Sequence, residues 1–428
     1  MTKNKDLALE GLRGLACLSV VVGHFTYIFF PYLENNFRPI PGVQPAYLVE
    51  RLLEYPPFTL AFSADAAVSI FFVLSGYVLT TKYFRNHEVS ALQSAATKRY
   101  VRLMIPCFAS VVLAWVIWRA GLTFSQDALA IHVAGWVPTA YAGHFRFSQS
   151  IIQGLFGAPL FGICTLNAPL WSIQVELIGS LLLFFVLAAL GRHPMWLVFW
   201  FLFFADILGY RSSNVLYYVS FGAGAALNPA REWLKRHEPI SLTLAIFGII
   251  GVAFNHFYTY RPIEAIPLPD LAPYGPNFAD GVPLTSELWW HSIGAVLLVA
   301  GAIGSRRVAA AFASRLPVLL GKLSFAIYVL HWPILMSVGL GAAWGLQKIG
   351  IPFVFSVVTA FVVFMSTTFA MATLFERFID RPSIRLADMI SMRALKPIAI
   401  DPGRRQLVSD NLAFADGPSG LSGSQAVD

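Results

Sequence analysis

The stretch LEGLRGLACLSVVVGHF, residues 9–25, opens the first long apolar segment of the chain and carries Glu10, Arg13 and His24. Arg13 and His24 are separated by close to three helical turns, so in a helix they share one face and lie about 16 Å apart along the axis. Titratable side chains are costly inside a membrane, and two on one stripe predict a polar cavity within a helix bundle. Taken singly, Arg13 would mark the membrane edge and His24 would be a hydrogen-bonded core residue.

The composition is typical of an integral membrane protein. Of the 428 residues, 57% are hydrophobic and only 12% are charged, and the mean hydropathy is +0.65. A soluble domain of this length carries about a quarter charged residues. We therefore interpret the net charge of +7 loop by loop as an orientation signal, and we do not expect nucleic acid as a partner.

The cysteines and histidines give no metal-binding pattern. Cys17, Cys107 and Cys164 fall at unrelated positions, which predicts neither a disulfide framework nor metal-ligand spacing. No His-Glu-x-x-His motif occurs among the nine histidines. We therefore expect no metal dependence.

Apolar segments of membrane-spanning length predict an all-α polytopic bundle of about ten transmembrane helices. The predicted spans are residues 12–30, 60–80, 103–119, 167–190, 195–210, 214–229, 240–258, 288–304, 317–344 and 351–375. Lys and Arg concentrate in alternate connecting segments, which places both termini in the cytoplasm by the positive-inside rule. We expect a multi-pass protein of the cell (inner or plasma) membrane, with residues 1–382 in the membrane domain and 383–428 as a disordered cytoplasmic tail.

A cluster of basic side chains begins the third predicted span. Lys98, Arg99 and Arg102 are three or four residues apart, so they converge on one helix surface. Such a cluster is common where a helix meets lipid headgroups. Arginine donors also match phosphate oxygens in bidentate geometry, which favours a phosphate clamp.

Glu176 is an acid within the fourth predicted span, which opens NAPLWSIQVE. It lies about 13 Å below the outer end of its helix, and His24 lies about 9 Å below the outer end of its own. These similar depths predict contact, in which a carboxylate would fix the imidazole tautomer and stabilise the imidazolium. The alternative is a protonated glutamic acid that is simply hydrogen-bonded.

The segment LSFAIYVLHWP, residues 323–333, places Ser324, Tyr328 and His331 at positions i, i+4 and i+7 of one helix. Pro333 removes a backbone donor and can open room for a ligand. Alternatively, the three polar residues only hold helices together. In the second span, the Ser75-Gly76 pair of SIFFVLSG permits close helix approach.

Together these segments resemble the acyltransferase 3 family of integral membrane enzymes. The opening segment is similar to the family's first helix, in which an Arg and a His are separated by ten residues. Further similarities are FFVLSG in the second span, the Arg-x-x-Arg motif at Arg99 and Arg102 followed by Pro106, PLWSIQVE, LSFAIYVLHWP, and the closing ERFIDRP at residues 376–382. Two positions depart from the family pattern: Ser69-Ile70 replace an Asp before the two Phe, and Leu177 replaces a second Glu.

The resemblance implies an O-acyltransferase that moves an acyl group, usually acetyl, from cytoplasmic acyl-coenzyme A to a hydroxyl of a carbohydrate, a lipid-linked glycan or a similar acceptor, as in polysaccharide modification. His24 is expected to act as general base with Glu176 orienting it, and an acyl-histidine is a less favoured variant. The expected donor-binding residues are Arg13, Lys98, Arg99 and Arg102. Residues expected to support the site are Ser75, Ser324, Tyr328 and His331.

Two other functions use similar residues. A proton-coupled secondary transporter also carries intramembrane His and Glu, although the paired broken helices or inverted halves typical of transporters are not evident in this sequence. A membrane scaffold would not need an Arg and a His aligned at depth. The sequence leaves the acceptor, the acyl length and the oligomeric state open.

Overall fold

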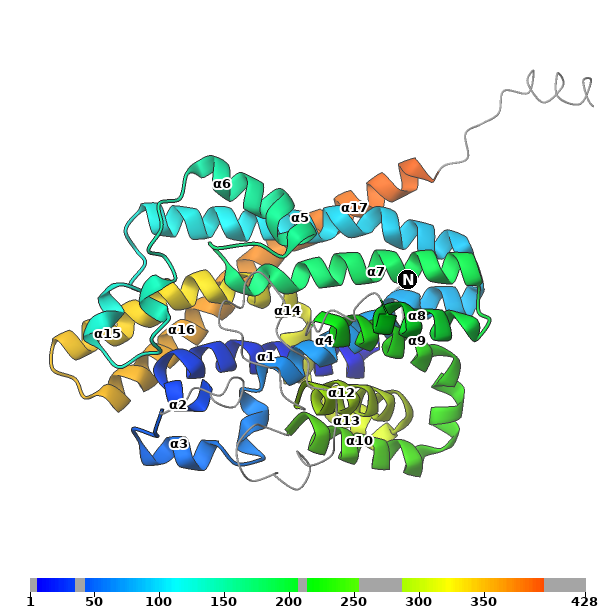
Figure 1. Cartoon of the computed structure of the whole chain (residues 1–428), viewed down its shortest axis with the longest axis horizontal. Helices are drawn as coiled ribbons and strands as arrows, with labels where there is room; N and C mark the ends of the chain where they lie inside the picture. Colours follow the sequence, from blue (N-terminus) through cyan, green and yellow to red (C-terminus); the bar gives the residue numbers. More distant parts are fainter. Residues whose placement is uncertain (1–5, 35–42, 207–213, 254–286, 396–428) are drawn as a thin grey trace, which may run out of the picture.

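A computed structural model of the chain describes residues 6–34, 43–206, 214–253 and 287–395 (Figure 1). All regular elements within these ranges are helical. Six described stretches are long and apolar enough to cross a membrane. They are Leu7–Phe29 (α1), Ala64–Asn86 (α4), Val89–Arg119 (α5), Ala168–Leu190 (η5 and α7), Arg315–Lys348 and Phe353–Ala394. The fifth stretch consists of α14, η7 (Leu335–Gly339) and α15 (Leu340–Lys348), and the sixth consists of α16 (Phe353–Phe375), η8 (Glu376–Asp380) and α17.

The predicted number of ten spans is not confirmed. A seventh span is present only if Leu288–Gly304 in α12 (Glu287–Gly304) and α13 (Arg306–Phe312) count together across their 101° bend. The helices α8 (Met195–Asp206) and α10 (Glu238–Ala253) are shorter than a span, and the second half of α9 (Asn214–Arg236) is rich in charged residues. The location of the two termini stays a prediction.

The remaining described elements are short. They are α2 (Pro31–Glu34), α3 (Leu48–Leu53), η1 (Phe58–Ala61), η2 (Asp127–Ala130), η3 (Val137–Thr139), α6 (Phe147–Ile152) and η4 (Gln153–Phe161). Most of them connect the long helices of the bundle.

The C-terminal part differs from the predicted disordered tail. The first part of the predicted tail, residues 383–394, belongs to α17 (Arg381–Ala394). This helix packs against the first half of α5 (Figure 1). Lys98 Nζ lies 2.8 Å from Asp388 Oδ1, and the hydroxyls of Ser94 and Ser391 are 3.0 Å apart. Ordering of this segment therefore comes from tertiary contacts, and the rest of the tail lies outside the described residues.

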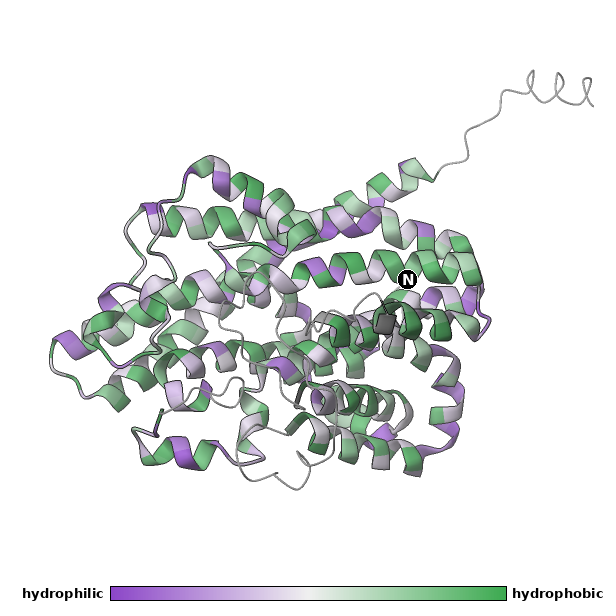
Figure 2. Ribbon diagram, viewed as in Figure 1, coloured by the Kyte–Doolittle hydropathy of each residue, from purple (hydrophilic) through white to green (hydrophobic). Residues whose placement is uncertain are grey.

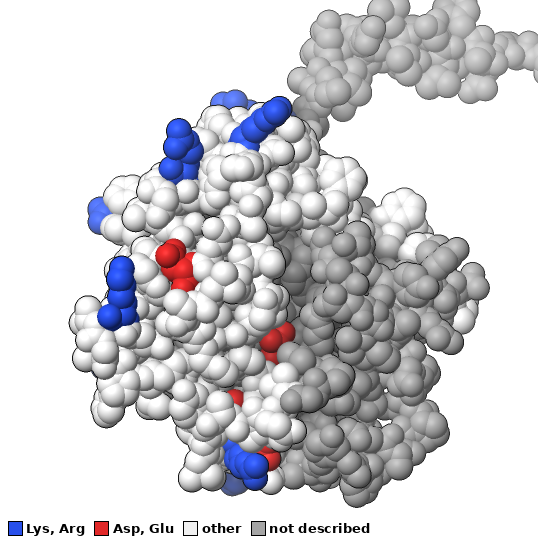
Figure 3. Space-filling view, turned by 60° about the vertical axis from the view of Figure 1, so that its left-hand side comes forward, with Lys and Arg blue, Asp and Glu red and all other residues white. Residues whose placement is uncertain are grey.

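Hydrophobic residues run along nearly all the described helices (Figure 2), and many large hydrophobic side chains are exposed as well as buried. Phe185, Phe355 and Phe378 are each more than 60% exposed. Charged side chains are sparse over the described part of the face in Figure 3. An exterior of this kind suits contact with lipid chains and supports an integral membrane protein.

Glycines bring α1 and α14 (Arg315–Ile334) into close contact. A Cβ on Gly14 would lie 2.3 Å from the Gly321 backbone nitrogen, and one on Gly321 would lie 2.0 Å from the Glu10 carbonyl oxygen. Further along, Cys17 Sγ donates to the Ser324 carbonyl and His24 meets His331. These contacts advance together along both helices, so α1 and α14 are parallel.

Candidate functional site

A cavity of about 140 Å³, open to the outside, lies between α1, α4, α5, α7 (Trp171–Leu190) and α14. Its basic end is lined by Arg13, Arg99, Arg102 and Glu176. Its aromatic end is lined mainly by Val68, Phe71, Phe72, Ile173 and Tyr328. The cavity therefore suits a long ligand with a charged head and an apolar tip.

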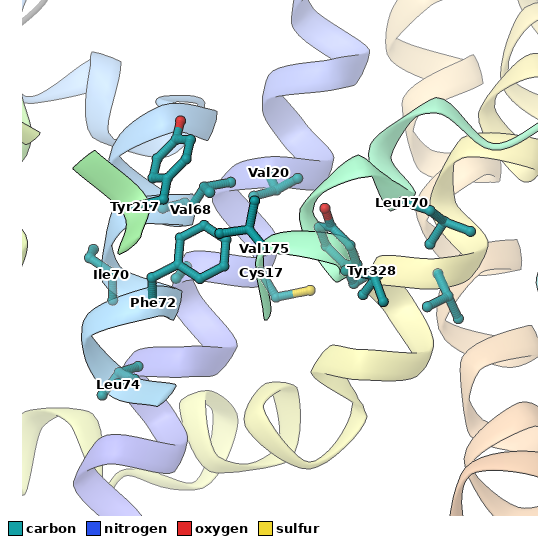
Figure 4. Close-up of a cluster of buried hydrophobic side chains, with 14 of the residues drawn as sticks. Cys17, Val20, Val68, Ile70, Phe72, Leu74, Leu170, Val175, Tyr217 and Tyr328 are labelled. Atoms are coloured by element: carbon teal, nitrogen blue, oxygen red, sulfur yellow. The ribbon is translucent and has the colours of Figure 1, made fainter. Parts of the chain in front are cut away.

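The order of residues along the cavity follows from contacts between helices. At one level, Tyr328 of α14 contacts Ser172 of α7 and Phe71 of α4. One helical turn away, Ser75 of α4 hydrogen-bonds to Glu176 of α7. In Figure 4, apolar side chains from α1, α4 and α7 gather beside Tyr328. The aromatic end is thus deeper in the bundle than the basic end.

Glu176 is paired at the basic end of the cavity. Its Oε1 accepts a 2.9 Å hydrogen bond from Ser75 Oγ and forms an ion pair with the Arg99 guanidinium. Arg99 Nε also donates to Ser180 Oγ at 3.0 Å, and its side chain is only 6% exposed. Arg99, predicted to bind the donor, and Glu176, predicted to be catalytic, therefore neutralise each other's charge within the cavity wall.

The predicted contact between Glu176 and His24 is wrong. His24 faces His331 of α14, and all hydrogen bonds of Glu176 go to Ser75 and Arg99. The two residues lie at comparable depth, but depth specifies only the height of a residue along its helix. The rotation of α7 about its own axis directs Glu176 towards α4 and α5 and away from α1.

His24 belongs to a chain of hydrogen bonds. Its Nδ1 lies 3.0 Å from His331 Nε2, with the rings stacked at 5.0 Å, and His331 Nδ1 lies 2.6 Å from the Tyr328 carbonyl oxygen. A carbonyl only accepts, so His331 Nδ1 carries the proton and a neutral His331 accepts at Nε2. His24 must then donate from Nδ1, which leaves a lone pair on its Nε2.

The His24 Nε2 lone pair has no hydrogen-bond donor among the described residues. The His24 side chain is partly exposed, whereas His331 is fully buried. Neither imidazole lines the cavity, whereas Tyr328, one turn before His331 on α14, does. His24 is therefore arranged as a proton acceptor on the far side of Tyr328 from the basic end.

The four predicted donor-binding residues lie in four different environments. Arg13 Nη2 donates to the Gly321 carbonyl at 2.8 Å and pairs with Glu10, while its buried Nε has no acceptor in the described part of the chain. Arg102 lines the cavity and is exposed. Arg99 is buried against Glu176, and Lys98 pairs with Asp388 away from the cavity lining.

The predicted polar stripe on α14 is confirmed as one helix face. Ser324 and Tyr328 line the cavity, and His331 follows on the next turn. Ser324 Oγ donates to the Gly321 carbonyl at 2.8 Å. The Tyr328 hydroxyl donates to the Pro169 carbonyl at 2.6 Å and lies 2.6 Å from Ser172 Oγ.

Asn167 is a structural residue that the sequence analysis overlooked. Pro333 cannot donate to the carbonyl of Val329, four residues earlier, and Asn167 Nδ2 donates to that oxygen at 2.8 Å instead. This bond fixes the short helix η5 (Ala168–Leu170) beside Tyr328. The only sequence signal for this contact was Pro333 within a predicted helix, which leaves one carbonyl without its usual donor. The sequence does not show that Asn167 is the residue that replaces that donor.

Two tryptophans on the other side of His24 were also overlooked. The Trp332 ring meets His24 edge-on at 5.5 Å and stacks on Trp136 at 5.9 Å. Trp136 Nε1 donates to both carboxylate oxygens of Glu34 at 3.1 Å. His24 is thereby connected through aromatic rings to the end of α1 that is opposite the basic end.

Comparison with known proteins gives a family and several relatives. The family model described as an acyltransferase domain, that of acyltransferase 3, matches residues 6–376. Acyltransferase R4 of Phoma sp. (strain ATCC 20986 / MF5453) is 23% identical over 89% of this chain and 95% of its own length. O-acetyltransferase PaAT-1 of Phomopsis amygdali is 22% identical over 91% and 85%, and acyltransferase clz18 of Cochliobolus lunatus is 23% identical over 89% and 95%. No solved structure matches the chain.

Proposed function

Because the chain belongs to the acyltransferase 3 family and is a membrane O-acyltransferase, we propose that it takes an acetyl or other short acyl group from acyl-coenzyme A. The acceptor in this proposal is a hydroxyl of a carbohydrate or a similar molecule. The observation that carries the proposal is the chain from the Tyr328 carbonyl through His331 to His24, which leaves His24 Nε2 as a base.

The cavity suits the donor because of its polarity. The exposed Arg102 and the buried Nε of Arg13, which has no acceptor among the described residues, would bind phosphate oxygens at the basic end. The flexible arm of coenzyme A would then extend between apolar walls, with its thioester at Tyr328. We place the basic end at the cytoplasmic side, where acyl-coenzyme A is available.

Arg99 has a different role in this proposal from the one that the sequence suggested. Its charge is already compensated by Glu176, and its Nε is used by Ser180. Binding phosphate would require breaking a buried ion pair, which costs several kcal/mol. Arg99 and Glu176 therefore hold α5 and α7 together at the cavity wall, and Arg13 and Arg102 are the better phosphate ligands.

His24 acts as the general base in the proposed reaction. Its Nε2 removes the proton of the acceptor hydroxyl while that oxygen attacks the thioester carbonyl. The tetrahedral intermediate expels the coenzyme A thiolate, which recovers the proton from His24. His331 positions the His24 ring and accepts from Nδ1 throughout, so the imidazolium keeps its hydrogen bond.

One relative supports the acetyl group and the oxygen acceptor. The Phomopsis amygdali protein is named an O-acetyltransferase, and the match covers most of both chains. At 22% identity this supports the reaction class for the present chain and leaves the acceptor to experiment.

The test is acyl transfer from labelled acetyl-coenzyme A by the full chain in lipid nanodiscs, followed by free-thiol release and by label in a glycan fraction. We expect His24→Ala to abolish both signals, and the matched variant His144→Ala, at an exposed histidine outside the cavity, to retain them. Substantial transfer by the His24 variant would refute the assigned base.

A further inference from the structure

Tyr328 separates the cavity from the two histidines. Its side chain lines the aromatic end. Its ring centroid lies 6.2 Å from that of Phe71, which also lines the cavity, and 5.8 Å from that of His331, which does not. His24 does not line the cavity, and its Nδ1 is bonded to His331, one turn beyond Tyr328 on α14. A donor that occupies the cavity therefore meets the Tyr328 ring before it meets the base.

The position of the Tyr328 ring is firmly held. Its hydroxyl donates to the Pro169 carbonyl and is bonded to Ser172 Oγ, both at 2.6 Å, and all three residues are buried. The η5 turn that carries Pro169 is itself held to α14 by Asn167. Moving the ring would leave buried polar groups unpaired, which is unfavourable in apolar surroundings.

We propose that Tyr328 determines the size of the acyl group that passes from the donor cavity to His24. The inference rests on the proposed function, because it concerns the same donor. The acyl group is the leading tip of acyl-coenzyme A, and the walls next to Tyr328, such as Phe72 and Ile173, are apolar. A short acyl group fits beside the fixed ring, whereas a longer chain collides with it.

The experiment compares two donors on each variant. Thioester cleavage of acetyl-coenzyme A and of hexanoyl-coenzyme A is followed as free thiol, with the full chain in nanodiscs and water as the acyl acceptor. We expect Tyr328→Ala to raise the hexanoyl-to-acetyl ratio of kcat/KM by at least about tenfold, equivalent to about 1.4 kcal/mol in relative barriers. Tyr328→Phe keeps the ring and should stay within about threefold of the wild-type ratio.

The matched control is Tyr141→Ala. Tyr141 is also a buried tyrosine whose hydroxyl donates to a backbone carbonyl, that of Leu166, but it does not line the cavity. Its replacement should lower the rates for both donors equally and leave their ratio unchanged. The ratio does not depend on the amount of active protein, so a merely structural role of Tyr328 would leave it unchanged as well.

Three results would overturn the inference. The first is an unchanged ratio in Tyr328→Ala. If that variant does not fold, it is replaced by Phe71→Ala, which removes the ring next to Tyr328. An unchanged hexanoyl-to-acetyl ratio in Phe71→Ala is the second such result. The third is a wild-type protein that cleaves neither donor, either with water or with the glycan fraction of the transfer assay as acceptor. That result refutes the proposed function itself and is thereby distinguishable from the other two.

Discussion

His331 Nε2 lies 3.0 Å from His24 Nδ1, and this contact joins the two parallel helices α1 and α14 at the proposed base. The Tyr328 carbonyl lies 2.6 Å from His331 Nδ1 and determines which nitrogen of each histidine carries the proton. A second imidazole therefore takes the positioning role that the sequence analysis assigned to a carboxylate. Because neutral His331 carries no charge, it orients His24 without adding a fixed negative charge to the membrane interior.

Replacement of His331 tests this positioning role. We expect His331→Ala to lower kcat about 10- to 100-fold with little change in KM for acetyl-coenzyme A, because His24 loses the partner that fixes its tautomer. His331→Gln, which keeps an acceptor, should recover part of the loss. Steady-state kinetics in nanodiscs provide the measurement, and a change confined to KM would contradict the role.

Glu176 and Arg99 should be coupled in stability. Glu176→Gln leaves the buried Arg99 charge without its counter-ion, and we expect a loss of about 3–5 kcal/mol in unfolding free energy. The double replacement Glu176→Gln with Arg99→Met should be more stable than the single variant. Thermal unfolding in detergent measures both, and additive effects of the two changes would argue against the pair.

Arg102 should contribute to donor affinity more than to the chemical step. Loss of a hydrogen bond to a charged group costs about 1.5–3 kcal/mol, so Arg102→Gln should raise KM for acetyl-coenzyme A about 10- to 100-fold. The variant should also be less sensitive to added salt, since fewer charges attract the donor. Arg146→Gln, at an exposed arginine that does not line the cavity, is the control and should behave like wild type.

Gly14 should be intolerant of any side chain. A Cβ there would lie 2.3 Å from the Gly321 nitrogen, so Gly14→Ala forces α1 away from α14 and lengthens the His24–His331 contact. We expect lower thermal stability and a loss of activity greater than the loss of folded protein. Gly345→Ala is the matched helical control, because a Cβ there meets nothing within 4 Å.

Glu50 should make α3 sensitive to pH. Its side chain is buried, and Oε2 has no partner in the described chain, so burial raises the pKa of Glu50 above its ordinary value. A raised pKa means that the protonated form favours the fold, and this contribution is lost as pH rises through the folded-state pKa. The protection factors of the α3 amides, which are corrected for the intrinsic pH dependence of exchange, should therefore fall from pH 4.5 upward in wild type and change less in Glu50→Gln.

Several features of the site were determined by sequence alone. Arg13 and His24, and likewise Ser324, Tyr328 and His331, share helix faces because the helical repeat of 3.6 residues places them there whatever surrounds the helix. The family motifs indicated acyl transfer from the sequence alone, because each motif consists of particular residue types at helical spacings.

Only the tertiary structure decided which faces meet. Glu176 contacts Arg99 instead of His24 because a helix can rotate about its axis without changing the depth of any residue. The bond from Asn167 to the Val329 carbonyl, and with it the position of Tyr328, joins segments far apart in the chain. Helical periodicity is a local property of the backbone, whereas pairing between helices depends on the packing of the entire bundle.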